Sequence, residues 1–195
     1  MKISLVVITL NQCLKLNRLL SSSLDYVDEI IVVDGGSTDD TEKICKIHQA
    51  KMYVKKWENN FSIQKKIALD KANGDWILSL DDDEVLEYSL WAHLYDIMKT
   101  DKDGNKCYSI IRKNYYRFES FKHSEDLLNF PDYQMRFFRR GMQFNNEIIH
   151  AGIDTSGYEN IKIPLEFGGI IHEKTWEDQK KADILYRNIE KSYNK

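Results

Sequence analysis

Two apolar runs rich in β-branched residues constrain the fold of this chain more than any other feature of its sequence. Ile3–Thr9 and Glu29–Val33 consist mainly of Val, Ile and Leu, which is typical of strands buried on both faces of a parallel sheet. Leucines at helical spacing lie between the two runs, and Ser37–Asp40 is a capping signal for a second helix that ends near Gln49. The sequence therefore begins with a predicted β-α-β-α order.

The same order continues beyond the second helix. A short strand is predicted near Lys51–Lys55, a helix over about Ser62–Asn73, and a strand over Trp76–Leu80 that ends in four acids. Four strands joined by crossover helices indicate an α/β fold with a doubly wound, mostly parallel sheet.

The second half of the chain is less regular. The aromatic-rich stretch Asn114–Pro131 has little periodicity, and we interpret it as loops over a surface or a site. In the remainder we expect a helix after Glu84 and up to about Lys99, strands around Tyr108–Arg112 and Gln134–Phe138, and a final helix over Thr175–Tyr193.

Composition excludes several classes of protein. The 195 residues suit a single domain that buries a core without staples. With 28 basic and 31 acidic side chains the net charge is -3, so the basic excess of a nucleic-acid binder is missing. The 3 cysteines form no CxxC pair, which argues against a zinc site or a disulfide framework. No stretch approaches ~20 apolar residues, so we expect a cytoplasmic protein without a transmembrane segment.

Polar side chains stand where the predicted strands end. Thr9 and Asn11 follow the first strand, Asp34 follows the second, and Asp81–Glu84 follow the fourth. Because ligands of open parallel sheets bind outside the carboxyl ends of the strands, these residues predict one polar site. Consecutive acids need a positive neighbour, and a magnesium or manganese ion shared with a nucleotide diphosphate supplies one.

Plainer interpretations of the same residues stay open. The four acids can form a solvated loop before a helix whose dipole favours an acidic first turn. Asp34 can serve as a cap or a turn former. The Asp34–Asp39 turn contains two glycines but matches neither GxGxxG nor GxxxxGK[ST], so neither a dinucleotide fold nor a P-loop is indicated.

Three segments carry a family resemblance: ISLVVITLN, VDEIIVVDGGSTDDT and FSIQKKIALDKANGDWILSLDDDE. Together they resemble the nucleotide-binding half of family 2 inverting glycosyltransferases of the GT-A fold. PDYQMRFFRRG and GGIIHEKTW are similar to later segments of the short bacterial enzymes of lipopolysaccharide core assembly. The resemblance implies a GT-A-like, Rossmann-type sheet flanked by helices in one domain over residues 1–195. About 1–113 would bind the nucleotide sugar, and about 114–195 would face the acceptor.

The resemblance also implies roles for the nucleotide-binding residues. Thr9 and Asn11 would line the nucleobase pocket, and Asp34 would bond the base or its ribose. Gln64 and Lys65 would face the nucleotide, with Lys65 standing where arginine is more usual. For this pair a solvated helix face is the alternative.

A metal site follows from the same resemblance. Asp81 and Asp83 match a DxD motif, in which the second Asp binds Mn²⁺ or Mg²⁺ and the first contacts the ribose or a metal-bound water. Asp82 stands where a small residue is typical, and we group it with the nucleotide-sugar-binding residues. His172 is the candidate third ligand, although a lone histidine is more often structural.

The catalytic base departs from the pattern. An inverting transfer needs a carboxylate that takes the proton of the acceptor hydroxyl. Similar short enzymes carry a His-Glu pair after the arginine-rich segment, whereas Ala151 follows His150 here. Glu147 and Asp132 are the candidates, and we favour Glu147 because it lies near the usual position. Arg136 is a candidate for holding the diphosphate or an anionic acceptor.

These inferences predict a metal-dependent inverting glycosyltransferase that moves a sugar, with UDP as the expected carrier, to a hydroxyl of a glycan or lipid-linked acceptor in cell-surface polysaccharide synthesis. One alternative is a sugar nucleotidyltransferase, but TLNQCLKLNR lacks the glycine-rich phosphate loop usual after the first strand. Another is a nucleotide-binding relative that has lost transfer activity. Peripheral association with the inner face of the membrane stays open, although the mixed charges of the final helix favour a solvated helix.

Overall fold

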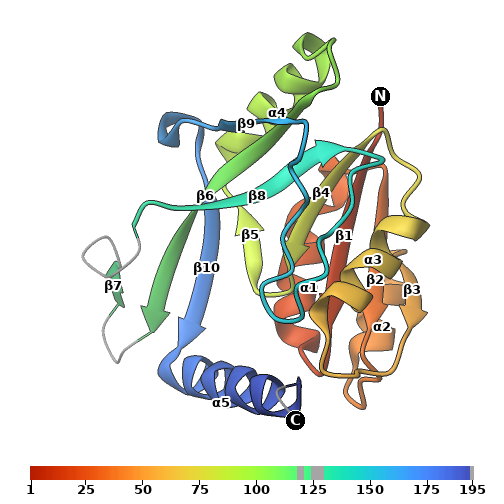
Figure 1. Cartoon of the computed structure of the whole chain (residues 1–195), viewed down its shortest axis with the longest axis vertical. Coiled ribbons are helices and arrows are strands. Elements are labelled where there is room, and N and C mark those ends of the chain that lie inside the picture. The colour runs from red at the N-terminus through yellow and green to blue at the C-terminus, as the bar shows by residue number, and fades with distance from the viewer. Residues whose placement is uncertain (118–120, 124–129, 194–195) are drawn as a thin grey trace.

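The computed structural model describes residues 1–117, 121–123 and 130–193 (Figure 1). Their strands form one sheet in the order β3-β2-β1-β4-β8-β6-β10-β5, and β7 and β9 also pair with β6. The α/β architecture and the mostly parallel sheet flanked by helices are therefore confirmed. The strands are β1 (Ile3–Thr9), β2 (Glu29–Asp34), β3 (Lys51–Val54), β4 (Trp76–Asp81), β5 (Glu84–Leu86), β6 (Lys106–Arg117), β7 (Phe121–His123), β8 (Asp132–Arg139), β9 (Glu159–Lys162) and β10 (Ile170–Thr175). The helices are α1 (Cys13–Ser23), α2 (Thr41–Ile47), α3 (Phe61–Lys71), α4 (Tyr88–Thr100) and α5 (Trp176–Tyr193).

The first four strands form the parallel part of the sheet. β1 lies between β2 and β4, with Leu5 in register with Ile30 on one side and Leu78 on the other. Alternate side chains of β1 enter two hydrophobic clusters, one beneath α1 and α4 and one beneath α3. Burial on both faces explains why β1 and β2 have continuous apolar sequences.

The second half of the chain extends this sheet with antiparallel strands. β8 pairs antiparallel with β4, and β6 then pairs antiparallel with β8. β10 is inserted between β6, to which it is parallel, and β5, to which it is antiparallel. Segments that are distant in sequence therefore meet beside the carboxyl end of β4.

Several predictions about secondary structure were wrong. The helix expected after Glu84 is present as Tyr88–Thr100, but sequence patterns missed the short strand β5 that precedes it. The Asn114–Pro131 stretch is not all loop, since β6 continues to Arg117 and β7 follows. Sequence patterns also missed β9 and β10. Short strands of this kind are stabilised by partners far away in sequence, which local periodicity does not record.

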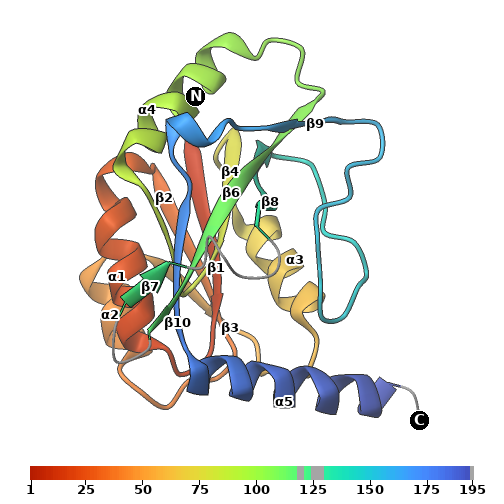
Figure 2. The ribbon, with the colours of Figure 1, turned by 90° about the vertical axis from the view of Figure 1, so that its left-hand side faces the viewer.

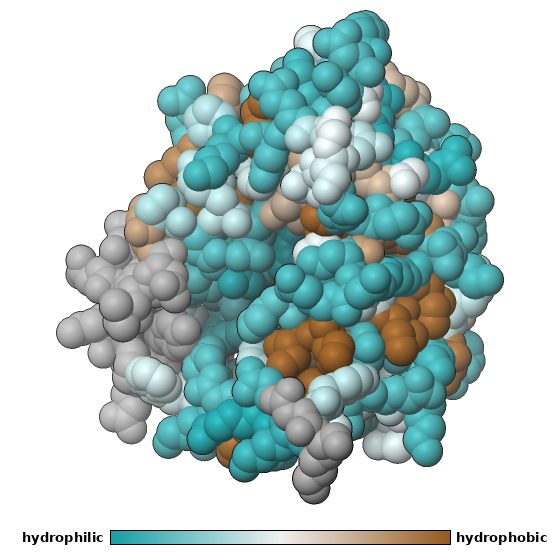
Figure 3. Space-filling view, in the orientation of Figure 1, coloured by the Kyte–Doolittle hydropathy of each residue, from teal (hydrophilic) through white to brown (hydrophobic). Residues whose placement is uncertain are grey.

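Helix α5 lies across the end of the sheet to which β1 and β10 point (Figures 1 and 2). Asp178 of α5 forms an ion pair with Lys15 of α1 at 3.2 Å, and the ring of Tyr186 lies 6.1 Å from that of Phe61 on α3. The face seen in Figure 3 is largely hydrophilic, with apolar side chains gathered over α3 and the loop beside it. Among the described residues, no helix combines the length and the apolar character that crossing a membrane requires.

Candidate active site

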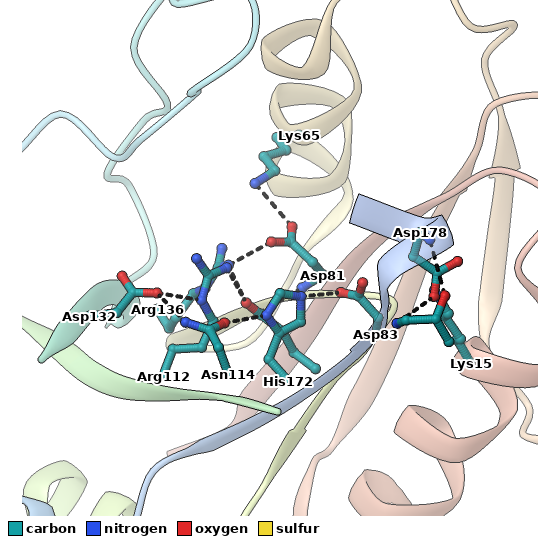
Figure 4. A network of polar contacts seen from close by, with 12 residues as sticks. Lys15, Lys65, Asp81, Asp83, Arg112, Asn114, Asp132, Arg136, His172 and Asp178 are labelled. Carbon is teal, nitrogen blue, oxygen red and sulfur yellow. Dashed lines mark hydrogen bonds and ion pairs between the residues drawn. The ribbon is translucent and has the colours of Figure 1, made fainter. Parts of the chain in front are cut away.

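Asp81, the last residue of β4, points at two cationic side chains (Figure 4). Its Oδ2 accepts a hydrogen bond from Arg136 Nη2 at 2.6 Å, and Lys65 Nζ lies 3.2 Å from its Oδ1. Arg136 also donates to the fully buried Glu84 at 2.7 Å. Burial would raise the pKa of Asp81, but the charges of Arg136 and Lys65 hold it well below its usual range. The chain itself therefore supplies much of the positive charge that the consecutive acids require.

Asp82 turns the other way, toward the end of β1. Its Oδ2 accepts a hydrogen bond from Thr9 Oγ1 at 2.7 Å. Burial, and then the negative charge of Asp83, raise the pKa of Asp82 to about 8. Positive charge on this side of the turn is therefore electrostatically favoured.

Asp83 faces the buried side chain of His172 on β10 (Figure 4). Asp83 Oδ1 and His172 Nε2 are 3.3 Å apart, and His172 Nδ1 lies 2.6 Å from Asn114 Oδ1. Although burial raises the pKa of Asp83, its contact with His172 lowers it below the usual range. The three consecutive aspartates thus point to three different sets of partners.

Asp83 and His172 are suited to a divalent cation that also binds substrate. Magnesium-type ions commonly take one or two protein carboxylates and complete their shell with water and phosphate oxygens. Within the described part of the chain, no group of three or more His, Cys, Asp or Glu side chains is placed to hold an ion by itself. The residues fit a cation shared with a diphosphate rather than a closed structural metal site.

Asn11 and Asp34, predicted to bind the nucleoside, shape the loops at the same edge of the sheet. Asn11 Oδ1 accepts a hydrogen bond from the backbone N–H of Thr38 at 2.8 Å. Asp34 is buried, and its Oδ2 accepts from the N–H groups of Gly36 and Ser37, both at 2.9 Å. The hydroxyl of Ser37 donates to the other oxygen. Both carboxylate oxygens of Asp34 are therefore bonded to the turn.

Gln64 and Lys65 are neighbours on α3 that face different surroundings. Gln64 is buried and donates from Nε2 to the carbonyl of Lys55 at 2.6 Å. Its Oε1 has no hydrogen-bond partner within the described residues. Lys65 instead extends to the acidic turn, where its Nζ pairs with Asp81. The same Nζ lies 5.5 Å from the ring centre of Phe144. Of this pair, Lys65 is the side chain that the structure brings to Asp81.

Asp132, one candidate for the base, is held by three donors. Its carboxylate accepts from Arg112 Nε at 2.8 Å, from Asn114 Nδ2 at 3.2 Å and from Gln134 Nε2. Burial raises the pKa of Asp132, but the charge of Arg112 and these hydrogen bonds bring it below its usual range. A carboxylate in this state is a weak proton acceptor.

Glu147, the favoured candidate, is exposed in the loop after β8, where its N–H donates to Asn145 Oδ1. In the same loop, His150 packs edge-on against Tyr186 of α5 at 5.8 Å. Burial and then the charges of Asp81 and Asp83 raise the pKa of Tyr186. Tyr186 therefore joins α5 both to this loop and, through Phe61, to α3.

Sequence patterns gave no role to Arg112, Asn114 or Tyr186. A usable signal existed for Arg112, because a charge within an apolar strand predicts a buried ion pair. Asn114 and Tyr186 carry no comparable signal, since their neighbours come from other strands and from a distant loop.

Comparisons with known proteins identify the family. The model of the family described as glycosyl transferase family 2 matches residues 4–158. An uncharacterized glycosyltransferase of Rickettsia felis is 43% identical over 110 residues, covering 56% of this chain and 38% of the relative. A TPR repeat-containing protein of Synechococcus elongatus is 41% identical over 112 residues, covering 57% of this chain and 27% of the relative. The chain thus spans between about a quarter and two fifths of the length of these two relatives.

The fold comparison agrees with the sequence match. A crystal structure of S. aureus TarS 1-349 in complex with UDP-GlcNAc superposes with a TM-score of 0.58 at 19% identity, covering 89% of this chain and 59% of that chain. At that identity the likeness concerns the fold, and the sequence match supplies the family. The chain therefore belongs to glycosyl transferase family 2.

Proposed function

We propose that this chain is the catalytic part of a metal-dependent, inverting glycosyltransferase that moves a sugar from a UDP-linked donor to a hydroxyl of a glycan or lipid-linked acceptor. The acidic turn after β4 carries the proposal. Its carboxylates lie at the carboxyl edge of the parallel strands, where open α/β sheets bind ligands. A lysine of α3 and a histidine of β10 contact these carboxylates. Family membership supports the class of reaction.

We assign different parts of the donor to different side chains around the turn. Asp83 and His172 would hold Mn²⁺ or Mg²⁺, and such an ion, when bound, neutralises charge on the leaving diphosphate. Lys65 adds a point charge next to the same group. Asn11 and Asp34 keep the loops after β1 and β2 in the shape that receives the nucleoside.

A role in cell-surface polysaccharide synthesis, at the inner face of the membrane, is the second part of the proposal. The mixed charges in the sequence of α5 predicted a solvated helix. In the structure, two of its acids are less exposed than its other charged residues. Asp178 pairs inward with Lys15, and Asp183 is half-buried. The exposed charged residues of α5 are four cations, Lys180, Lys181, Arg187 and Lys191, and two acids, Glu177 and Glu190. This excess supports the approach of an anionic lipid surface bearing the acceptor.

A nucleotide-binding protein without transfer activity is the second candidate function. Ala151 occupies the position of the expected acid, Glu147 is exposed, and Asp132 is bound by three donors. Assays of donor hydrolysis with a panel of nucleotide sugars separate the two candidates. Release of free sugar supports the transferase, and binding without release supports the inactive relative.

The proposal is tested by titrating UDP into the protein with and without Mn²⁺ in a calorimeter. We expect Mn²⁺-dependent binding in the wild type and its loss in Asp83→Ala, because this variant removes a carboxylate ligand and leaves the phosphate charge without a counter-charge. Asp103→Ala removes an exposed carboxylate from the loop after α4 and serves as the matched control. Unchanged affinity in Asp83→Ala would mean that the acidic turn is only a solvated loop.

A further inference from the structure

Strand β10 places His172 in a row of polar side chains that crosses the sheet. His172 is in register with Asn114 on parallel β6 and with Glu84 on antiparallel β5. Asp132 of β8 is in register with Arg112 of β6. Arg112 and Asn114 are two residues apart on β6, so their side chains lie on the same face of the sheet. Sheet register therefore brings Asp132, Asn114 and His172 into contact.

Asp132 determines which way the amide of Asn114 points. An ionised carboxylate only accepts hydrogen bonds, and the lowered pKa of Asp132 keeps it ionised at neutral pH. Nδ2 of Asn114 donates to this carboxylate at 3.2 Å, so Oδ1 of the same amide faces His172 (Figure 4). Arg112 and Gln134 hold the carboxylate from two other sides.

The orientation of Asn114 in turn selects the protonated nitrogen of His172. An amide oxygen only accepts, so Nδ1, which lies 2.6 Å from Oδ1, carries the proton. In a neutral ring Nε2 is then left with a lone pair directed at Asp83 Oδ1, 3.3 Å away. A proton shared by these two atoms makes the contact an ion pair, and a divalent cation bound between them would take the place of that proton.

We propose that Asn114 is a positioning residue that, fixed by Asp132, holds His172 with its proton on Nδ1 and presents Nε2 together with Asp83 to the divalent cation bound with UDP. This rests on the proposed function, since it assumes a cation at Asp83 and His172. Outer hydrogen bonds of metal-binding histidines typically change metal affinity by about 10–100-fold.

The first test needs neither metal nor nucleotide. Nitrogen-15 NMR of the wild-type chain at about pH 8, where an ordinary imidazole is neutral, reports which nitrogen of His172 carries the proton. We expect the Nδ1-protonated form in the wild type and a mixture of both forms in Asn114→Ala. A wild-type ring that carries its proton on Nε2 and none on Nδ1 overturns the inference, and this result requires no folded variant.

The second test is calorimetry with Mn²⁺ and the UDP-bound protein. We expect Asn114→Ala to weaken Mn²⁺ binding by about 10–100-fold. Asn17→Ala is the matched control, because it removes an amide that contacts a different histidine, His48, at 2.8 Å and contacts neither Asp132 nor His172, and its Mn²⁺ affinity should stay close to that of the wild type. Circular dichroism verifies that both variants fold.

The outcomes separate this inference from the function on which it rests. Equal Mn²⁺ affinity in Asn114→Ala and the wild type, or an equal loss in Asn17→Ala, overturns the role of Asn114 while leaving the function intact. A wild type that binds no Mn²⁺ with UDP refutes the metal-dependent function. In that event the NMR result still decides whether Asn114 fixes the ring of His172.

Discussion

Asp34 is buried at the end of β2, with both carboxylate oxygens bonded to the turn that follows. We expect Asp34→Ala to lower the free energy of unfolding by about 2–3 kcal/mol, because hydrogen bonds to a buried charge are lost and the N–H groups of Gly36 and Ser37 lose their acceptor. Urea denaturation measures this change.

Calorimetry with uridine or UDP gives the complementary result for Asp34. If the side chain acts through the turn, affinity falls together with stability, and Asp34→Asn, which keeps an acceptor oxygen, retains more of both. Full stability with lost nucleoside affinity would instead show that Asp34 bonds the base or ribose directly.

Glu147 and Asp132, the two candidates for the base, lie in different surroundings. Glu147 is exposed, whereas Asp132 accepts three hydrogen bonds that lower its pKa. We expect Glu147→Gln to retain UDP binding and to lose transfer by about a hundred- to ten-thousand-fold, the usual cost of a lost general base. Asp132→Asn should keep more activity. The assay is sugar transfer to a membrane-derived acceptor. The reverse order, with Mn²⁺-dependent UDP binding retained in Asp132→Asn, would assign the base to Asp132.

At the scale of elements, Glu29 links the amino-terminal ends of two strands to the turn before β4. Its carboxylate accepts from Ser4, from the N–H groups of Asn73 and Gly74, and from Lys51. Burial alone would raise the pKa of Glu29, but these hydrogen bonds lower it from 4.5 to about 2. The difference corresponds to roughly 3 kcal/mol of stability.

The sign of this contribution sets its pH dependence. Because the pKa of Glu29 is lower in the folded state, the stabilisation is fully present above about pH 4.5 and is lost as the pH falls through about 2. We expect Glu29→Gln to be much less stable than the wild type at pH 7 and to approach it near pH 2. Urea unfolding across this range is the measurement. Glu58→Gln, at an exposed ion pair, should follow the wild type throughout.

Strands with an apolar pattern in their own sequence could be predicted, whereas strands that depend on distant partners could not. β1 and β2 were predicted almost to their ends, because strands that are buried on both faces have continuous apolar sequences. β5 and β10 are short, and they are strands because they pair with each other and, for β10, with β6. Nothing local in their sequences records those partners.

At the scale of the whole molecule, one network joins the two parts of the chain. Arg136 of β8 donates to Asp81 and to fully buried Glu84, and Arg112 of β6 also contacts Glu84, at 3.2 Å. We expect Arg136→Met to lose about 3–5 kcal/mol in urea unfolding, because it leaves a buried carboxylate without its partner. Arg140→Met, at an exposed arginine nearby, is the control.

A double variant, Arg136→Met with Glu84→Gln, separates charge from packing. It should recover part of the stability lost in the single variant, since no ionised glutamate is then left buried. A single variant within 1 kcal/mol of the wild type, on the scale of an exposed pair, would show that solvent compensates these charges.

Sequence order predicted the part of the candidate site that lies at strand ends, but not the part that depends on sheet register. The strand-end rule correctly placed Thr9 beside the acids, as its hydrogen bond to Asp82 shows, while the roles of both residues in nucleotide binding stay predictions. Arg112 and Asn114 reach the site through the register of β6 with β8 and β10. Register is a property of the assembled sheet, and sequence spacing does not encode it.

The insertion of β10 between β6 and β5 has a consequence for the growing chain. On the ribosome, β4 and its acidic turn emerge long before His172, because about ninety residues separate Asp83 from His172. Until β10 is in place, Asp83 lacks its histidine neighbour, and the space between β6 and β5 has no strand to fill it. We therefore expect a chain that stops before β10 to lack the Asp83–His172 contact on which the proposed metal site depends.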